Sequence, residues 1–210
     1  MVKIITIEGN IGSGKSTLIN RLKKENKNGL IYFLPEPIDE WNKIRDRRGV
    51  TILELYYRDK TKYSFSFQMM AYITRLSQIK NYIKTIPSDA IIITERCLYT
   101  DRYVFAKMLY DTGFIEEIEY TIYIKWFTEF EEYTRLDKII YIKTDPEVCQ
   151  ERINKRNRKG EENIPLDYLR DCHAYHENWI DLERDLNNHL IVIDGNKKDI
   201  DTSLIFNSLK

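Results

Sequence analysis

Residues 9–17 read GNIGSGKST and directly follow the apolar run KIITIE at residues 3–8. The segment fits the pattern G-x-x-x-x-G-K-[ST], which binds phosphate when it lies between a strand and a helix. Its glycines let the backbone turn N–H groups toward an anion, and a helix that begins near Gly14 adds partial positive charge at its N-terminus. We therefore expect this loop to hold the phosphates of a nucleoside triphosphate.

Two side chains of the loop are suited to contact phosphate and a metal ion. Lys15 is long enough to reach the outer phosphates, and the hydroxyl of Ser16 is a suitable ligand for Mg²⁺. The predicted phosphate-binding residues of the loop are Asn10, Gly12, Ser13, Gly14, Lys15, Ser16 and Thr17.

The rest of the chain alternates apolar runs with amphipathic stretches. The runs are rich in β-branched residues and nearly continuous, which is typical of parallel strands covered on both faces. This alternation predicts an α/β fold with a five-stranded parallel sheet and helices on both faces. Asp145 followed by Pro146 predicts a capped helix start. Strands are predicted at 2–8, 30–35, 90–95, 138–143 and 190–194, and helices at 66–85, 145–156 and 165–186.

The length and the charge balance limit the possible functions. A chain of 210 residues suits one domain over residues 1–210. The 33 basic and 33 acidic residues balance, so no overall charge favours nucleic acid or a membrane as a partner. The three cysteines form no disulfide framework, and a strand from residue 2 leaves no room for a targeting peptide. We expect a cytoplasmic protein that binds neither nucleic acid nor membrane.

Acidic residues follow the second and third predicted strands. Glu36, in PEPIDEW at 35–41, can take a proton from an attacking hydroxyl or can cap a helix. Glu95 and Arg96 end the third strand, where the acid can hold Mg²⁺ through water and the arginine can clamp phosphate. The alternative for this pair is a salt-bridged strand end.

A basic run, RINKRNRK at 152–159, has five cationic residues in eight. Such a run is either a solvated face or a lid whose arginines stabilise a phosphoryl group during transfer. Beside a phosphate loop we expect an arginine-rich lid over about residues 152–163.

Taken together, these segments resemble the deoxynucleoside kinases of the deoxycytidine, deoxyguanosine and insect multisubstrate type. The resemblance covers nearly the whole chain. It rests on IEGNIGSGKST, PEPIDEW, YSFSFQMMAYITR, ERCLYTDRYVFA, R-x-x-x-R-N-R and IPLDYLRDCHAYHENW, in that order. It implies transfer of the γ-phosphoryl group of ATP, with Mg²⁺, to the 5′-hydroxyl of a deoxynucleoside, in a homodimer that serves nucleotide salvage.

The resemblance also implies roles for individual residues. Glu36 is the base for the 5′-hydroxyl, Arg96 orients that hydroxyl, and Glu95 accompanies Mg²⁺ with Ser16. Arg152, Arg156 and Arg158 reach the donor phosphates from the lid, and the stretch after Asp194 touches the donor base. The nucleoside-binding residues are Ile11, Trp41, Tyr57, Phe67, Gln68, Arg75, Asp101, Phe105 and Glu161, with Glu162 as the alternative to Glu161.

The resemblance also implies a base preference, because the deoxycytidine and purine kinases carry an Arg and an Asp at the positions of Arg75 and Asp101, whereas thymidine-accepting members carry apolar residues there. The alternative for this pair is a structural ion pair. Asp101 can hold Arg75, which then presents a donor to the base and crowds the methyl group of thymine. We expect deoxycytidine or a purine deoxynucleoside to be preferred over thymidine.

Other functions fit the sequence less well. A thymidylate kinase-like monophosphate kinase shares the phosphate loop, but its phosphate acceptor needs no base at Glu36. NKKD at 196–199 matches a guanine-reading motif, yet only 11 residues follow it, too few for the remaining elements of a GTP-dependent switch. A mere nucleotide-binding module has no use for Glu36 and Arg96 together. His173 and His176 lack a third metal ligand at suitable spacing, so we expect them to be helix-face residues.

Overall fold

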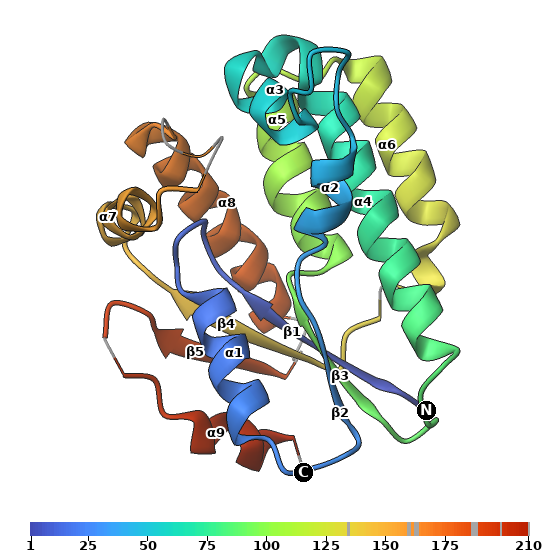
Figure 1. The fold of residues 1–210 in the computed structure, drawn as a ribbon, viewed down its shortest axis with the longest axis vertical. Coiled ribbons are helices and arrows are strands. Elements are labelled where there is room, and N and C mark those ends of the chain that lie inside the picture. Colours follow the sequence, from blue (N-terminus) through green and yellow to red (C-terminus); the bar gives the residue numbers. More distant parts are fainter. Residues whose placement is uncertain (134, 159–160, 162–163, 186–188, 198, 210) are drawn as a thin grey trace.

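The computed structural model describes residues 1–133, 135–158, 161, 164–185, 189–197 and 199–209. Its centre is one sheet in which every strand pair is parallel, in the order β2-β3-β1-β4-β5 (Figure 1). The five predicted strands are confirmed, each within one residue at either end. They are β1 (Lys3–Glu8), β2 (Ile31–Leu34), β3 (Ile91–Glu95), β4 (Lys138–Lys143) and β5 (Leu190–Asp194).

Helices cover both faces of the sheet, because alternate residues of each strand point to opposite sides. Ile5 and Ile7 of β1 pack with Leu22 of α1 (Lys15–Glu25) and with α9 (Thr202–Ser208). Ile4 packs on the other face with Ile79 of α4 (Lys60–Ile83). That second face also receives η1 (Thr100–Ala106), a π-helix, and α8 (Leu166–Asp185).

The helix expected to begin near Gly14 is α1, and the three helices predicted by residue range are present, with one difference in length and one in capping. α4 begins six residues before the predicted start, because Asp59 accepts a hydrogen bond from the backbone N–H of Lys62 and caps an earlier turn. α7 (Pro146–Arg156) has Asp145 at its N-cap position, but the prediction of a side-chain cap was wrong. The backbone N–H of Asp145 instead donates to Asn196.

Further helices gather beyond the carboxyl ends of β2 and β3, at the top of Figure 1. Their buried residues form one apolar cluster with residues of α4, including Trp41, Tyr56 and Phe67. None of the described helices is long and apolar enough to cross a membrane. The helices not predicted from the sequence are α2 (Ile38–Lys43), α3 (Ile52–Arg58), η1, α5 (Lys107–Asp111), α6 (Glu117–Glu129), η2 (Glu131–Tyr133) and α9.

Leu22→Ala tests the packing of α1 on the sheet. Leu22 is fully buried against β-strand isoleucines, so its truncation is expected to lower the free energy of unfolding by about 2–5 kcal/mol. Urea denaturation measures this change. Leu182→Ala on α8 is the matched control, because Leu182 is 56% exposed and its truncation is expected to change stability by less than about 0.5 kcal/mol. Equal losses in both variants would contradict the packing described.

Candidate active site

A cavity of about 610 Å³ opens at the carboxyl ends of β1, β2 and β3. It is lined by every residue that the sequence predicted for the site, except Asn10. The predicted residues come from segments that are far apart in the chain, and the sheet brings their ends to one edge.

The phosphate loop between β1 and α1 needs its glycines for steric reasons. Gly12 has φ +80°, and a Cβ there would lie 2.5 Å from the carbonyl oxygen of Cys149. The side chain of Asn10 fixes the shape of the loop. Its amide N–H donates to Leu169 O at 2.8 Å, and its amide oxygen accepts from the N–H of Ile11. Asn10 therefore shapes the loop and fixes it to α8, and its side chain is turned away from the cavity.

Lys15 is buried at the start of α1. Its Nζ donates to the carbonyl oxygens of Gly9 at 3.1 Å and Asn10 at 2.8 Å. Burial, assisted by the positive charge of Arg96, lowers the pKa of Lys15 to about 8. A phosphate anion in the loop would stabilise the charged form.

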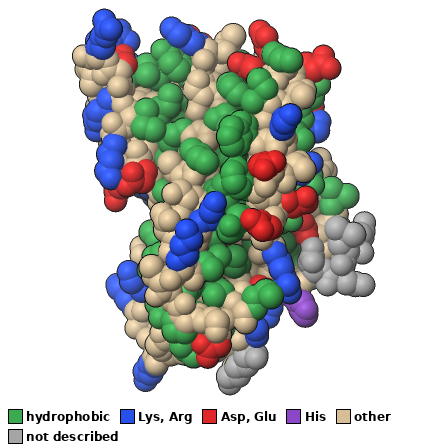
Figure 2. Space-filling model, turned by 90° about the vertical axis from the view of Figure 1, so that its right-hand side faces the viewer, with side chains coloured by type: hydrophobic (Ala, Val, Ile, Leu, Met, Phe, Trp, Pro, Cys, Tyr) green, Lys and Arg blue, Asp and Glu red, His purple; other side chains and the backbone are tan. Residues whose placement is uncertain are grey.

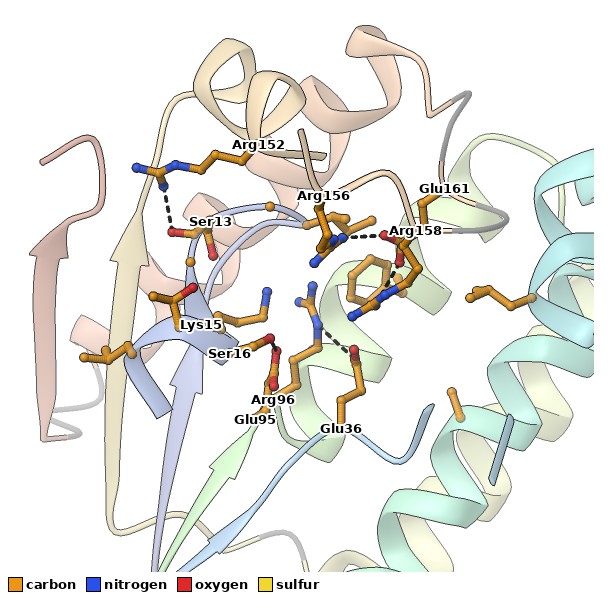
Figure 3. Close-up of a pocket in the computed structure, with 18 of the residues that line it drawn as sticks. Ser13, Lys15, Ser16, Glu36, Glu95, Arg96, Arg152, Arg156, Arg158 and Glu161 are labelled. Carbon is orange, nitrogen blue, oxygen red and sulfur yellow. Dashed lines mark hydrogen bonds and ion pairs between the residues drawn. The ribbon is translucent and has the colours of Figure 1, made fainter. Parts of the chain in front are cut away.

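Ser16 and Glu95 provide oxygen ligands beside the phosphate loop. The Ser16 hydroxyl donates to Glu95 Oε1 at 2.7 Å (Figure 3). A hydroxyl and a carboxylate are hard oxygen ligands, and Mg²⁺ commonly takes one or two of them together with phosphate oxygens and water. The described residues contain no group of three or more His, Cys, Asp or Glu that could hold a metal alone. The residues present thus fit Mg²⁺ bound together with a phosphate ligand.

Glu36 lies between two guanidinium groups just beyond β2. Its Oε1 is 3.3 Å from Nε of Arg96 and 3.4 Å from Nη2 of Arg75. Burial raises the pKa of Glu36, but the charges of Arg96, Arg75 and Lys15 outweigh it and hold the pKa below its usual value. Glu36 is therefore a carboxylate at neutral pH, and it does not serve as a helix cap, since α2 has no side-chain cap.

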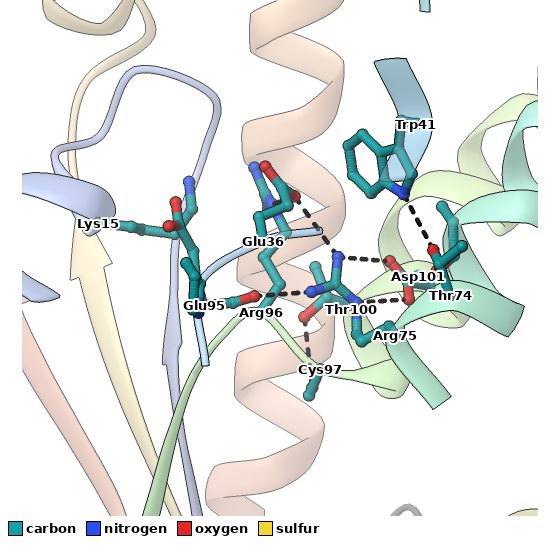
Figure 4. A network of polar contacts seen from close by, with 12 residues as sticks. Lys15, Glu36, Trp41, Thr74, Arg75, Glu95, Arg96, Cys97, Thr100 and Asp101 are labelled. Carbon is teal, nitrogen blue, oxygen red and sulfur yellow. Dashed lines mark hydrogen bonds and ion pairs between the residues drawn. The ribbon is translucent and has the colours of Figure 1, made fainter. Parts of the chain in front are cut away.

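Arg75, on α4, is the centre of a buried network (Figure 4). Its Nε donates to Asp101 at 2.9 Å, and its Nη1 donates to the carbonyl oxygen of Glu95 at 2.7 Å. Burial raises the pKa of Asp101 although Arg75 opposes this shift. The predicted pairing of Arg75 with Asp101 is present, and it also ties α4 to η1.

Aromatic side chains line the end of the cavity that lies away from the phosphate loop. Trp41 meets Phe67 edge-on, with ring centroids 5.5 Å apart, and its indole N–H donates to Thr74. Tyr56 stacks on Phe67 at 4.6 Å and shares a 2.7 Å hydrogen bond with Tyr168. Neither Tyr56 nor Tyr168 was predicted, although Tyr56 adjoins Tyr57 and Tyr168 lies in the IPLDYLRD segment.

The lid arginines have two kinds of partner. Arg152 donates to the backbone carbonyls of Ser13 at 3.1 Å and Gly195 at 2.9 Å. Arg156 and Arg158 instead both pair with Glu161. Figure 3 shows these two arginines on the side of the cavity that faces Lys15 and Arg96. The alternative sugar-binding residue, Glu162, lies outside the described residues.

The segment after β5 reaches the same cavity. Gly195, Lys197 and Ile200 line it beside the phosphate loop, where the sequence predicted contact with the donor base. One residue of the guanine-reading match at 196–199 lies outside the described residues.

Comparisons with known proteins agree with this geometry. A sequence model of the family described as deoxynucleoside kinase matches residues 5–206. The chain belongs to the deoxynucleoside kinase family. A probable deoxycytidine kinase of fowlpox virus is 39% identical over 182 residues, covering 85% of this chain and 72% of the relative. Mouse deoxycytidine kinase is 34% identical over 199 residues, covering 85% and 75%.

A third relative is described as a kinase of deoxyguanosine rather than deoxycytidine. The mitochondrial deoxyguanosine kinase of Xenopus laevis is 35% identical over 196 residues, which cover 85% of this chain and 73% of the relative. The kinase described here therefore uses a nucleoside triphosphate donor and serves deoxynucleoside salvage. This assignment confirms the predicted deoxynucleoside kinase of nucleotide salvage and rejects the GTP-dependent switch and the thymidylate kinase-like alternative.

The lowered pKa of Lys15 predicts a pH dependence for use of the donor. Lys15 is predicted to bind phosphate as a cation, and its pKa in the free kinase is about 8. The kcat/KM for the donor is therefore expected to fall about tenfold per pH unit above pH 8. Steady-state kinetics between about pH 7 and pH 9.5 measure this.

Lys15→Arg is the control, because a guanidinium stays charged over this range. Its kcat/KM is expected to be lower at every pH but without the fall. A wild-type profile that stays level to about pH 9.5, about one unit below the usual lysine pKa, would contradict the prediction.

Proposed function

We propose that Glu36 is the general base for transfer of the γ-phosphoryl group of ATP to the 5′-hydroxyl of a deoxynucleoside. The observation that carries this proposal is a charged carboxylate held by Arg75 and Arg96 in the same cavity as the phosphate loop. The 5′-oxygen forms a bond to the γ-phosphorus as its proton passes to Glu36, and the bond from the γ-phosphorus to the bridging oxygen of the diphosphate breaks.

Alignment and charge neutralisation supply most of the rate in such transfers. Lys15 and the inward N–H groups of the loop hold the outer phosphates of ATP, and Arg96 orients the hydroxyl beside Glu36. Arg156 and Arg158 leave Glu161 when the donor binds, and they then pair with its phosphate oxygens and stabilise the negative charge there. Arg152, whose guanidinium contacts Ser13 O and Gly195 O, acts by fixing the phosphate loop to the segment after β5.

Ser16 and Glu95 would hold Mg²⁺, with Glu95 reaching it directly or through water. The ion would neutralise charge on the phosphates and keep them in line with the acceptor.

The deoxynucleoside occupies the aromatic end of the cavity. The amide of Gln68 carries both a donor and an acceptor, so it can pair with the edge of a base. Phe67, Phe105 and Trp41 provide apolar ring surfaces for the base, and Ile11 packs beside them. Tyr57 and Glu161 hold the 3′-hydroxyl, a role that requires Glu161 to leave its lid arginines.

Glu36→Gln tests the base. The variant keeps the shape of the side chain and one acceptor oxygen but accepts no proton, so kcat is expected to fall about 10²- to 10⁴-fold. Phosphorylation of labelled deoxynucleosides with ATP measures kcat, and calorimetry measures nucleoside binding, which should change little. Glu40→Gln is the matched control, because Glu40 is exposed and pairs only with Lys43 among the described residues. Turnover retained in Glu36→Gln would refute this role.

The base preference rests on Arg75 and Asp101. Asp101 holds Arg75 in a buried pair, and the arginine presents a donor to the base and crowds a thymine methyl. The kcat/KM for deoxycytidine, deoxyadenosine or deoxyguanosine is expected to exceed that for thymidine about tenfold or more. Competition among the four natural deoxynucleosides measures this.

The paired change Arg75→Met with Asp101→Ala removes both charges together and is expected to raise the relative rate with thymidine. Removing both avoids an unpaired buried charge, which would cost stability by itself. Thymidine as the best substrate of the wild-type kinase would contradict the prediction.

We also propose that the kinase is a homodimer whose contact surface is the outer face of α4 and α6. Ile73 of α4 and Ile118, Ile122 and Trp126 of α6 are between 42 and 65% exposed. The α6 residues recur every four positions and form one stripe. Figure 2 shows hydrophobic side chains gathered along this side of the molecule, and such patches mark interaction sites.

Trp126→Glu tests the dimer. A charge at the C-terminal end of the stripe is expected to give a particle of 25.3 kDa, half the mass of the wild-type protein, by light scattering after gel filtration. Leu204→Glu is the control, because Leu204 is 62% exposed but lies on α9, which packs on the opposite face of the sheet. A wild-type protein that is itself monomeric, or a dimeric Trp126→Glu variant, would contradict the proposal.

A cytoplasmic location stays a prediction. The three cysteines are free and buried, and a reducing compartment would keep them so.

A further inference from the structure

The guanidinium group of Arg96 has a separate partner for almost every donor. Nε lies 3.3 Å from Glu36, and Nη1 lies 3.0 Å from the carbonyl oxygen of Gly9 and 3.4 Å from Nε2 of His176. The ring of Phe105 is 4.8 Å from the guanidinium carbon. Among the described residues, neither a hydrogen bond nor an ion pair occupies Nη2, and Arg96 lines the cavity.

The tautomer of His176 follows from its other contact. Nδ1 lies 2.6 Å from the carbonyl oxygen of Cys172, and a carbonyl oxygen can only accept. Nδ1 therefore carries the ring proton, and Nε2 presents a lone pair to Nη1 of Arg96. Burial and the charge of Arg96 hold the pKa of His176 well below its usual value, so the ring stays neutral.

The imidazole ring is itself held on several sides. Its plane is nearly parallel to the ring of Tyr141 on β4, with centroids 6.2 Å apart, and it meets Phe105 edge-on. His176 is fully buried on α8 and does not line the cavity. It can thus affect a reaction in the cavity only through the groups that it contacts. Both ring nitrogens are already used, which also removes the H-x-x-H metal site from consideration.

The backbone conformation of Arg96 also indicates that the surrounding residues hold this arginine in place. Arg96 has φ 65°, a left-handed conformation that is uncommon for a residue with a Cβ atom. Such strain occurs where the surrounding structure fixes a functional residue. Because a guanidinium is planar, acceptors on both hydrogens of Nη1 and a carboxylate on Nε determine where the two hydrogens of Nη2 lie.

We propose that His176 is a positioning residue for phosphoryl transfer: as a neutral acceptor it holds the Arg96 guanidinium in the rotation that offers Nη2 to the reacting oxygens. This inference rests on the proposed function, because it assumes that Arg96 orients the 5′-hydroxyl and the phosphates. Gly9 O supplies the second acceptor, so His176 links α8 to the same arginine that contacts the phosphate loop.

Two substitutions of His176 test the proposal. His176→Phe keeps an aromatic ring but removes the acceptor, and it is expected to lower kcat about 10- to 100-fold with little change in the KM for the nucleoside. His176→Gln places an amide oxygen near the position of Nε2 and is expected to recover most of this loss. His173→Phe, one turn earlier on α8 and without contact to Arg96, is the matched control and should keep the wild-type kcat.

A double-mutant cycle separates this inference from the proposed function. Arg96→Lys alone is expected to lower kcat, and adding His176→Phe should then cause no further loss. If Arg96→Lys keeps full turnover, the proposed role of Arg96 fails. If Arg96→Lys loses turnover while His176→Phe keeps it, or if the two losses are additive, only the role of His176 fails. Equal losses in His176→Phe and His176→Gln also overturn it.

A measurement on the unaltered protein covers the case in which His176→Phe does not fold. Nitrogen-15 NMR of histidine-labelled kinase is expected to show one buried imidazole with Nδ1 protonated and Nε2 unprotonated. A spectrum that instead shows Nε2 protonated for His176, identified by its loss in His176→Gln, would overturn the proposal.

Discussion

The ion pair between Glu36 and Arg96 is the contact on which the site depends. It joins Glu36, two positions after β2, to Arg96, the residue that follows β3, across the edge of the sheet. Each partner alone would be costly in this place, because an unpaired buried charge destabilises a protein strongly. Together they leave a carboxylate of lowered pKa beside the phosphate loop, which is the state that a proton acceptor needs. The proposed base is thus charged before any substrate binds.

Two further contacts join this ion pair to neighbouring helices. Arg75 brings α4 and η1 to Glu36 through Asp101, and His176 brings α8 to Arg96. A network of this kind is stable only if all of its members are satisfied. In the lid the arrangement is different, because Arg156 and Arg158 pair with Glu161, a residue that we assign to the sugar. Binding of donor and acceptor would then require the same partners to separate, which couples the lid to both substrates.

Much of the fold could be predicted from local patterns. The five strands are nearly continuous apolar runs, and each lies within one residue of its predicted bounds. The short helices α2, α3 and α5 were missed, because segments of five to seven residues carry too little periodicity to be distinguished from loops. α6 was missed although it has 13 residues, since its outer face is apolar as well and the contrast between its faces is weak. The start of α4 depended on the Asp59 cap rather than on the apolar stripe.

For the site, the sequence alone determined the chemistry: a phosphate loop, acids after two strands and a basic run can be read from residue types and spacing, since each is a local requirement of phosphoryl transfer. Only the tertiary structure decided the partners. Asn10 turned out to hold the loop to α8, Arg152 to contact backbone carbonyls, Tyr56 and Tyr168 to close the pocket, and His176 to face Arg96. The physical reason is that hydrogen bonds and ion pairs depend on distances of a few ångströms between residues up to 159 positions apart, and these distances exist only once the sheet is assembled.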